Sequence, residues 1–278
     1  MAGLIVFIIC AVILVWFLFG KKLKRKRGID LPINFRELLY ENVAYYRALT
    51  NTGKLRFEEK IKDFLSYVRI HGVNTDVEEL DKLLVASSAV IPIFGFDNWH
   101  YYNLRTVLLY EGAFTADSFS ITDNERSVLG MVGTGAMQRI MILSKPALRL
   151  GFLNEAGTHN TGIHEFVHLL DKADGATDGI PEQLLSRQYS IPWLNLMNET
   201  IEKIKQGNSD INPYGAISKT EFFAVAAEYF FQRPDLFKEN HPELFALMEQ
   251  IFHQRSQEAV KTENAKVRKI FKWIFRVY

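Results

Sequence analysis

The sequence predicts an α+β fold for the body of the protein, preceded by one membrane-spanning helix. The first observation is that Met1–Gly20 contains no charged side chain and is rich in Ile, Val, Leu and Phe. The second is a helical periodicity of apolar residues in the early and late parts of the remaining chain. The third is a set of short β-prone runs between them, of which Arg139–Leu143 (RIMIL) is the best defined. Such a mixture is typical of helices packed on a small sheet.

Composition limits the kinds of protein that this chain can be. Its 278 residues are 48% hydrophobic, which is enough for one large core or two small ones. A formal net charge of +1 argues against nucleic acid as a partner of the whole chain. Cys10 is the single cysteine, so neither an intrachain disulfide nor a cysteine-based zinc site can form. Any metal must therefore be held by His, Asp or Glu.

The N-terminal apolar run is expected to be an uncleaved membrane anchor. About 20 apolar residues in a helix span roughly 30 Å of hydrocarbon. The alternative is a cleaved signal peptide, which would carry its positive charges before the apolar run and a small-residue cleavage site after it. Here the basic cluster Lys21–Arg27 follows the run. Because Lys and Arg stay on the cytoplasmic side, we expect a single-pass protein of the inner (cytoplasmic) membrane with a cytoplasmic body.

Shifts in composition divide the chain into segments. They are the anchor (1–20), the basic linker (21–34), a body (35–260) made of a helical region (35–88) and a second part (89–260), and a basic amphipathic C-terminal helix (261–278). The apolar face of the last helix favours packing on the body. The alternative is that this helix lies flat on an anionic membrane surface.

Periodicity and breaker residues predict the elements of the body. The expected helices cover Phe35–Val73, Val77–Ser88, Asn160–Asp171, Ile191–Lys205, Glu221–Gln232 and Glu243–Val260. The expected strands cover Val90–Phe96, Thr106–Leu109 and Arg139–Leu143. Thr161 is the expected N-cap of the helix Asn160–Asp171, and either Ser218 or Thr220 caps the helix Glu221–Gln232.

The segment His164–His168 (HEFVH) carries the clearest chemical signal. Residues four apart on a helix lie on one face, so His164 and His168 can approach one ion together. Glu165 is turned about 100° round the helix from His164, where it reaches a metal-bound water rather than the ion. The pattern predicts zinc held by both histidines, with Glu165 activating the attacking water. The alternative is an ordinary helix with two incidental histidines.

The third metal ligand is expected among the downstream acids, because a catalytic zinc has three protein ligands and one open position. The candidates are Glu182, Glu199, Glu202, Asp210, Glu221 and Glu228. Glu221 and Glu228 lie in an apolar helix, where an unpaired carboxylate is costly. They are about 10 Å apart along the helix axis, so one binds the metal and the other supports an imidazole. The spacing does not say which of the two is the ligand.

Two segments of the chain resemble a known family. HEFVHLLD (His164–Asp171) and TEFFAVAAEYFF (Thr220–Phe231) are similar to the Mlc titration factor A family of zinc-dependent peptidases, itself related to the catalytic domain of anthrax lethal factor. The resemblance covers about Phe35–Phe252. It implies a zincin-like metallopeptidase domain whose catalytic part is 89–260. It also implies that Glu221 is the third zinc ligand and that Glu228 holds an imidazole N–H without binding the metal itself.

The resemblance extends to two more residues and has one departure. Tyr214, seven residues before Glu221, matches a tyrosine that would donate a hydrogen bond to the oxyanion. Asp171 also matches, either as a residue that holds an imidazole in place or as a cap for nearby loop amides. Many related zinc peptidases place an acid four residues after the ligand Glu, and here that position is Val225. Support for the imidazoles must therefore come from elsewhere.

Together these features predict a membrane-anchored zinc metallopeptidase that hydrolyses peptide bonds of a peptide or protein substrate. RIMIL is the strand expected to bind the substrate backbone, and His159 is expected to be a surface residue. The family name implies an alternative, a membrane-tethered regulator that binds and sequesters a transcriptional repressor or another protein partner. A structural zinc site is a third possibility. It would need a fourth protein ligand, and the sequence offers no obvious one.

Overall fold

The computed structural model describes residues 31–112, 114–115, 127–128, 130–132 and 139–254. Within these ranges no helix is both long enough and apolar enough to cross a membrane. The expected anchor (1–20), most of the basic linker and the expected C-terminal helix (261–278) lie outside the described residues. All the elements described below belong to one compact unit that begins at Leu31.

Helices make up most of the unit. They are α2 (Phe35–Asn42), α3 (Ala44–Ala48), α4 (Asn51–Tyr67), α5 (Glu79–Ile93), α6 (Lys145–Leu153), α7 (Thr161–Asp171), α8 (Ser190–Lys205), α9 (Lys219–Gln232), α10 (Pro234–Asn240) and α11 (Pro242–Phe252). Short 3-10 turns cover Lys172–Asp174, Arg187–Tyr189 and Pro213–Ala216. The helices expected over Asn160–Asp171, Ile191–Lys205 and Glu221–Gln232 are confirmed as α7, α8 and α9.

The strands form one mixed sheet and one short ribbon. The sheet contains β1 (Arg69–Val73), β2 (Thr106–Tyr110), β6 (Ile140–Ser144) and β5 (Gly130–Val132), in that spatial order. β1, β2 and β6 are parallel, and β5 runs antiparallel to β6. The ribbon pairs β3 (Phe114–Thr115) with β4 (Ser127–Val128). The α+β class is therefore confirmed, as are the strands expected over Thr106–Leu109 and Arg139–Leu143.

The position of β6 in the sheet corrects the role that the sequence suggested for RIMIL. β6 pairs with β2 along one edge and with β5 along the other, so its backbone has no free edge for a substrate. The prediction that RIMIL binds the substrate backbone is wrong. Among the strands that the structure describes, β5 is the outer neighbour of β6, and its second edge is unpaired.

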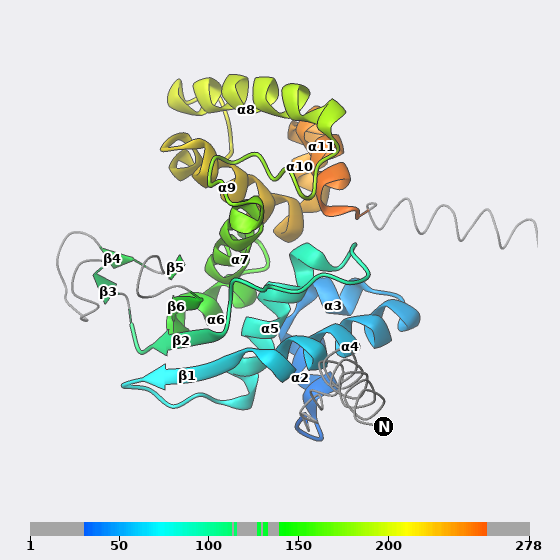
Figure 1. Ribbon diagram of the computed structural model, residues 1–278, viewed down its shortest axis with the longest axis vertical. Coiled ribbons are helices and arrows are strands. Elements are labelled where there is room, and N and C mark those ends of the chain that lie inside the picture. Colours follow the sequence, from blue (N-terminus) through cyan, green and yellow to red (C-terminus); the bar gives the residue numbers. More distant parts are fainter. Residues whose placement is uncertain (1–30, 113, 116–126, 129, 133–138, 255–278) are drawn as a thin grey trace, which may run out of the picture. The chain divides into compact units, whose positions relative to one another are not determined.

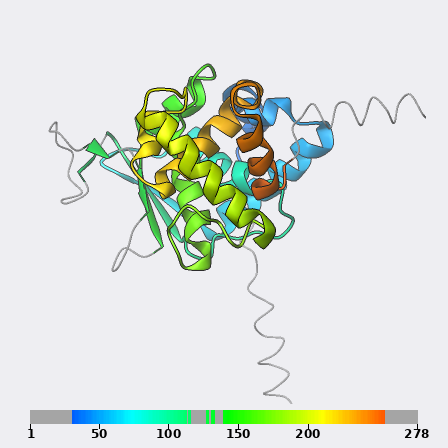
Figure 2. The ribbon, with the colours of Figure 1, turned by 90° about the horizontal axis from the view of Figure 1, so that it is seen from above.

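Helix α7 lies in the middle of the unit, with α9 on one side and α5 on the other (Figure 1). Strands β5 and β6 also contact α7, and the strands lie together at one side of the helices when the view is turned by 90° (Figure 2). The side chains of Ile163, Phe166 and Val167 are fully buried in this packing. Burial of so much apolar surface fixes α7 in place and with it the polar residues on its remaining face.

Two segments differ from the elements that the sequence predicts. Arg69–Val73, expected to continue a helix, is strand β1 because it pairs with β2 along its whole length. Val90–Phe96, expected to be a strand, continues helix α5 as far as Ile93, and Pro92 falls in the last turn. A short apolar run has the same pattern in a buried helix and in a buried strand, so periodicity alone does not separate them.

Side-chain caps fix where the two helices of chemical interest begin. The Asn160 side-chain oxygen accepts a hydrogen bond from the Ile163 amide at 3.0 Å. Thr161 is the first residue of α7, so the prediction that it is the N-cap is wrong. At α9, the Ser218 hydroxyl accepts a hydrogen bond from the Glu221 amide at 3.1 Å, which decides between the two expected caps. Both caps satisfy amides that a helix end leaves without partners.

Candidate metal centre

Three side chains from α7 and α9 converge on one point. His164 and His168 lie one turn apart on α7, and Glu221 lies in the first turn of α9. The Nε2 atoms of His164 and His168 are 3.0 Å apart. The Glu221 Oε2 atom is 2.9 Å from the Nε2 of His164 and 3.5 Å from that of His168. Of the described residues, these three are the group whose donor atoms lie close enough together to share a metal ion, all within 4.8 Å.

The donor set fits a zinc ion. Ligand atoms at 2.0–2.1 Å from one tetrahedral ion are about 3.4 Å apart, close to the spacings of these three atoms. Two imidazole nitrogens and one carboxylate oxygen are also ligands that zinc favours. Burial disfavours a charged imidazole, yet hydrogen bonds to Glu221 and Glu228 outweigh it and raise the pKa of His164 to about 10. The pocket therefore favours positive charge, which a divalent cation would supply.

Glu221 is placed so that it stays ionised. Burial opposes its negative charge, but hydrogen bonds from His164 and His168 lower the pKa of this carboxyl to about 2. Its position in the first turn of α9 adds the favourable end of the helix dipole. An ionised carboxylate is the form that binds a metal. Ser218, which caps the same turn, thus fixes the end of α9 from which the Glu221 side chain extends.

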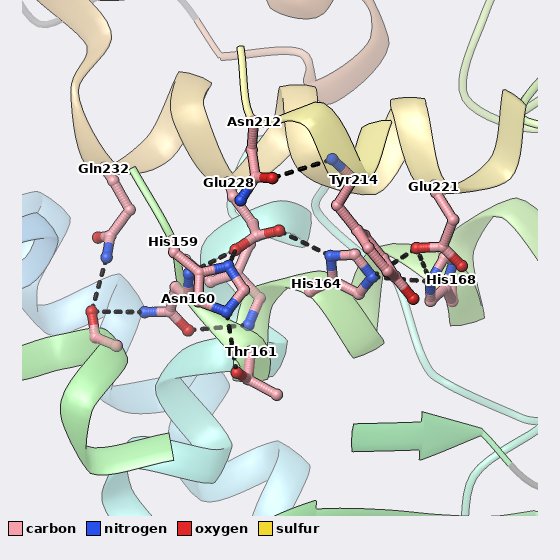
Figure 3. Close-up of polar contacts among 12 residues, drawn as sticks. His159, Asn160, Thr161, His164, His168, Asn212, Tyr214, Glu221, Glu228 and Gln232 are labelled. Atoms are coloured by element: carbon pink, nitrogen blue, oxygen red, sulfur yellow. Dashed lines mark hydrogen bonds and ion pairs between the residues drawn. The ribbon is translucent and has the colours of Figure 1, made fainter. Parts of the chain in front are cut away.

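Glu228 lies on the side of the His164 ring away from Glu221 and His168, as Figure 3 shows. Its Oε1 atom is 2.7 Å from His164 Nδ1, and its Oε2 atom accepts a hydrogen bond from the Asn160 amide. Burial alone would favour the neutral acid, but hydrogen bonds from His159 and His164 lower the pKa of Glu228. A carboxylate that accepts from Nδ1 directs the Nε2 lone pair of the same ring toward a metal. Of the two acids that the spacing left open, the distances thus favour Glu221 as the metal ligand.

His159 is a residue of this network that the sequence interpretation placed on the surface. Its side chain is 53% exposed, but Nδ1 lies 2.7 Å from Glu228 Oε2 (Figure 3). The bond raises the pKa of His159 against the opposing effect of burial. His159 thus shares the buried Glu228 carboxylate with His164. A signal was present in the sequence, because His159 directly precedes the capping residue of the metal helix.

Glu165 occupies a dry position next to the donor atoms. The residue is 5% exposed, and burial raises the pKa of its carboxyl, an effect that the nearby His164 and His168 oppose. It does not belong to the metal-binding group found among the described residues. A carboxyl with a raised pKa beside a metal centre matches the needs of a general base near neutral pH.

Tyr214 lies next to the centre and is partly exposed to solvent. It belongs to the 3-10 turn Pro213–Ala216, where the Asn212 side chain caps the turn by accepting from the Tyr214 amide at 3.0 Å. Its ring centroid is 6.0 Å from that of His164, and the residue is 50% exposed (Figure 3). Burial of the phenol and the nearby Glu221 both raise the pKa of Tyr214, so the hydroxyl keeps its proton. It is therefore available as a hydrogen-bond donor.

Asp171 supports the loop after α7. Its Oδ2 atom accepts a hydrogen bond from the Gly179 amide at 3.1 Å, while Oδ1 is buried without a hydrogen-bond partner. Within the described part of the chain, no hydrogen bond joins Asp171 to His164 or His168. Of the two roles expected for Asp171, the structure thus gives the loop cap. Gly179 in turn accepts from the Trp193 indole at 2.7 Å, so the contact ties α7 to α8.

Replacing Asp171 by Asn should remove a pH dependence of stability. Burial raises the pKa of this carboxyl from 3.8 to about 6. The folded chain therefore holds the proton more tightly than the unfolded chain, so the stability that this group contributes is fully present below pH 4 and is lost as the pH rises to about 6. We expect this group to account for a loss on the order of 2 kcal/mol over that range, and Asp171→Asn to abolish it. Urea unfolding of chelator-treated wild type and Asp171→Asn at pH 4 and pH 7 measures how the free energy of unfolding changes with pH. An equal change in the two proteins would contradict the prediction.

Comparison with known proteins gives a consistent result. The family described as glucose-regulated metallo-peptidase M90 matches residues 20–253. An uncharacterized protein of Synechocystis sp. is 27% identical over 235 residues, 80% of this chain and 84% of that protein. Mlc titration factor A of Escherichia fergusonii is 28% identical over 228 residues, 76% of this chain and 83% of its own. Mlc titration factor A of Pectobacterium atrosepticum is 26% identical over 196 residues, 65% of this chain and 69% of its own.

Proposed function

Because the chain belongs to the glucose-regulated metallo-peptidase M90 family, we propose that it is a zinc-dependent peptidase tethered to a membrane. The observation that carries the proposal is the convergence of His164, His168 and Glu221, whose donor atoms all lie within 4.8 Å. Glu165 is buried beside them, as a general base would be.

His164, His168 and Glu221 would hold the zinc ion, and Glu228 would orient the His164 ring. Bound there, zinc would supply Lewis-acid chemistry, polarising a carbonyl and acidifying a water molecule. No fourth protein ligand joins the group within the described residues, which leaves room for a water and a substrate. A structural zinc site would close that position, so the donor count favours a catalytic one.

The side chains around the centre divide the remaining chemistry. Glu165 accepts a proton from the attacking water and passes it to the leaving amine as the peptide bond breaks. Burial keeps this carboxylate away from bulk water, which strengthens its basicity. Tyr214 donates its hydroxyl hydrogen to the oxygen of the attacked carbonyl, where negative charge develops. The proton taken from water thus ends on the new amino terminus, and the hydroxyl of that water on the new carboxyl.

Tyr214→Phe is expected to slow peptide cleavage by about tenfold to a hundredfold, with the loss in kcat rather than KM. Removal of one oxyanion donor costs about 10² to 10³ in a dry site. A smaller effect is expected here because Tyr214 is 50% exposed. Steady-state kinetics on a cleaved peptide measure it. Tyr102→Phe is a matched control, since Tyr102 is 83% exposed and lies outside the site. Equal kinetics for both variants would remove Tyr214 from the mechanism.

Metal removal tests the proposed function directly. The full-length chain, incubated with a library of internally quenched peptides, should cleave at least one sequence. Treatment with a zinc chelator should reduce the rate by at least about a hundredfold, since a metal supplies several kcal/mol of transition-state stabilisation. Adding back zinc at one ion per chain should restore the rate. Cleavage that survives removal of all measurable metal would refute the proposal.

The proposal places the catalytic body at the cytoplasmic face of the inner membrane. It rests on the uncharged run Met1–Gly20 and the basic cluster Lys21–Arg27 that follows it. Protease digestion of sealed spheroplasts tests the orientation. The body should be protected until the membrane is permeabilised, and release of the whole protein by alkaline carbonate would argue against an anchor.

A second function is favoured by the names of the relatives. Proteins called Mlc titration factor A cover most of this chain, so a related chain that binds and sequesters a repressor or other protein regulator is the alternative. Binding alone needs no general base. The buried Glu165 next to three convergent donors therefore favours hydrolysis as the main activity.

A further inference from the structure

Gly130, the first residue of β5, contacts the proposed general base. A Cβ atom added at Gly130 would lie 2.5 Å from Glu165 Cγ, 2.6 Å from Glu165 Oε1 and 2.8 Å from Glu165 Cδ. All three distances are shorter than any ordinary contact between carbon or oxygen atoms. The three nearest atoms thus belong to one side chain. Any larger residue at Gly130 competes with Glu165 for the same space.

The backbone of Gly130 does not itself require glycine. Within the described residues, the glycines with left-handed backbone are Gly175, Gly179 and Gly207, and Gly130 is not among them. Gly130 sits in an extended strand, opposite Leu143 in the register of β5 and β6. Other residues adopt that conformation readily and usually pack better in a strand. The reason for glycine here is therefore the close approach of Glu165.

Other tightly packed glycines of the described chain meet different neighbours. A Cβ at Gly162 would meet Ser88 and Leu148, and one at Gly151 would meet Asn160. Those contacts belong to helix packing and capping. Gly130 differs because its neighbour is the residue to which the chemistry assigns proton transfer. Strand β5, which packs on α7 at this point (Figure 1), is therefore in direct contact with the proposed general base.

We propose that Gly130 is a positioning residue that acts through Glu165. Its missing side chain lets β5 pack against α7, and the strand backbone then lies directly against the Glu165 side chain and restricts its position. The carboxyl is held in one place beside His164 and His168 and is shielded from water. The inference rests on the proposed function, since it assigns a role in the same reaction. A displacement of about 1 Å from such a position can cost about a hundredfold in rate.

Four full-length proteins test the proposal: wild type, Gly130→Ala, Glu165→Ala and the double variant. Gly130→Ala should keep one zinc per chain, because it does not touch the ligands. Its kcat for a peptide cleaved by wild type should fall by about a hundredfold, with KM little changed. Gly53→Ala is the matched control. A Cβ at Gly53 has no neighbour closer than 3.3 Å, and Gly53 lies on α4, away from the site, so kcat should be unchanged.

Thermal unfolding of the same proteins gives a readout that does not depend on cleavage. In the wild-type background Gly130→Ala should lower the Tm by about 2 to 10 °C, as an overpacked contact does. Glu165→Ala removes all three clashing atoms, so in that background the same change should lower the Tm by less than about 2 °C. Should Gly130→Ala not fold alone, the double variant must still fold and bind zinc.

Three outcomes would overturn the inference. They are a Gly130→Ala protein that cleaves within threefold of wild type, an equal Tm loss in both backgrounds, and a double variant that does not fold. A wild-type chain that cleaves no peptide would instead refute the proposed function. The Tm loss caused by Gly130→Ala would then still be compared between the wild-type and Glu165→Ala backgrounds, and the difference would report on the contact between Gly130 and Glu165. Failure of the proposed function and failure of this inference are therefore distinguishable.

Discussion

Glu165→Gln is expected to lower peptide cleavage by about 10³-fold or more while zinc stays bound. The change keeps the shape of the side chain but removes the group that accepts the proton, and general acid–base catalysis contributes about 10² to 10⁴ in rate. The upper part of that range is expected because Glu165 acts twice, first on the water and then on the leaving amine. His164, His168 and Glu221 are untouched, so the zinc content should equal that of wild type. Single-turnover cleavage and metal analysis of the same samples measure both effects.

The same variant separates an enzyme from a binding protein. Glu182→Gln is the matched control, because Glu182 is an exposed acid that the sequence also offers as a candidate ligand. If the chain acts as a peptidase, only Glu165→Gln loses activity, and both variants bind any protein partner as wild type does. If the chain acts by sequestering a partner, Glu165→Gln still sequesters that partner in cells as fully as wild type does. Cleavage that continues unchanged in Glu165→Gln would remove Glu165 from the mechanism.

The parts of the site that lie on one helix could be predicted from the sequence. The pair His164 and His168 is a local pattern, because a helix places residues four apart on one face whatever surrounds it. The same holds for Glu165 on the next face. These positions need only that a helix forms, and the apolar spacing of α7 predicts that it does.

The parts that depend on two elements meeting could not be predicted from spacing. Which of Glu221 and Glu228 reaches the metal-binding nitrogens of the histidines depends on how α9 packs against α7. The spacing of the two acids along α9 is compatible with either acid as the ligand. The contacts favour Glu221 as the ligand, because it approaches Nε2 of His164, whereas Glu228 approaches Nδ1 of the same ring. The resemblance to known peptidases had implied the same assignment.

Other long-range features were missed or mistaken for the same reason. The bond between His159 and Glu228 joins residues far apart in the chain. The role of Gly130 depends on the packing of β5 against α7, which brings it close to Glu165. In the sequence alone, a single glycine in a short strand has many explanations. The run Val90–Phe96 reads as a strand in the sequence because Val90–Ile93 is apolar and buried without a polar face, so no helical period is visible.

Zinc affinity should distinguish Glu221 from Glu228 more sharply than any other measurement. Glu221→Ala removes a donor atom, and zinc binding worth about 10 to 16 kcal/mol over four ligands corresponds to a loss of about 70- to 900-fold in zinc affinity. Glu228→Gln keeps a hydrogen-bond acceptor near His164 Nδ1 but removes its charge, and such outer partners typically cost about 10- to 100-fold. Competition with a zinc chelator of known affinity measures both losses, and cobalt substitution adds a test of geometry.

The visible spectrum of the cobalt protein should change in Glu221→Ala, because one ligand is replaced, and stay close to wild type in Glu228→Gln. The reverse order of affinities and spectra would exchange the roles of the two acids, since only the residue bonded to the metal can alter its coordination directly.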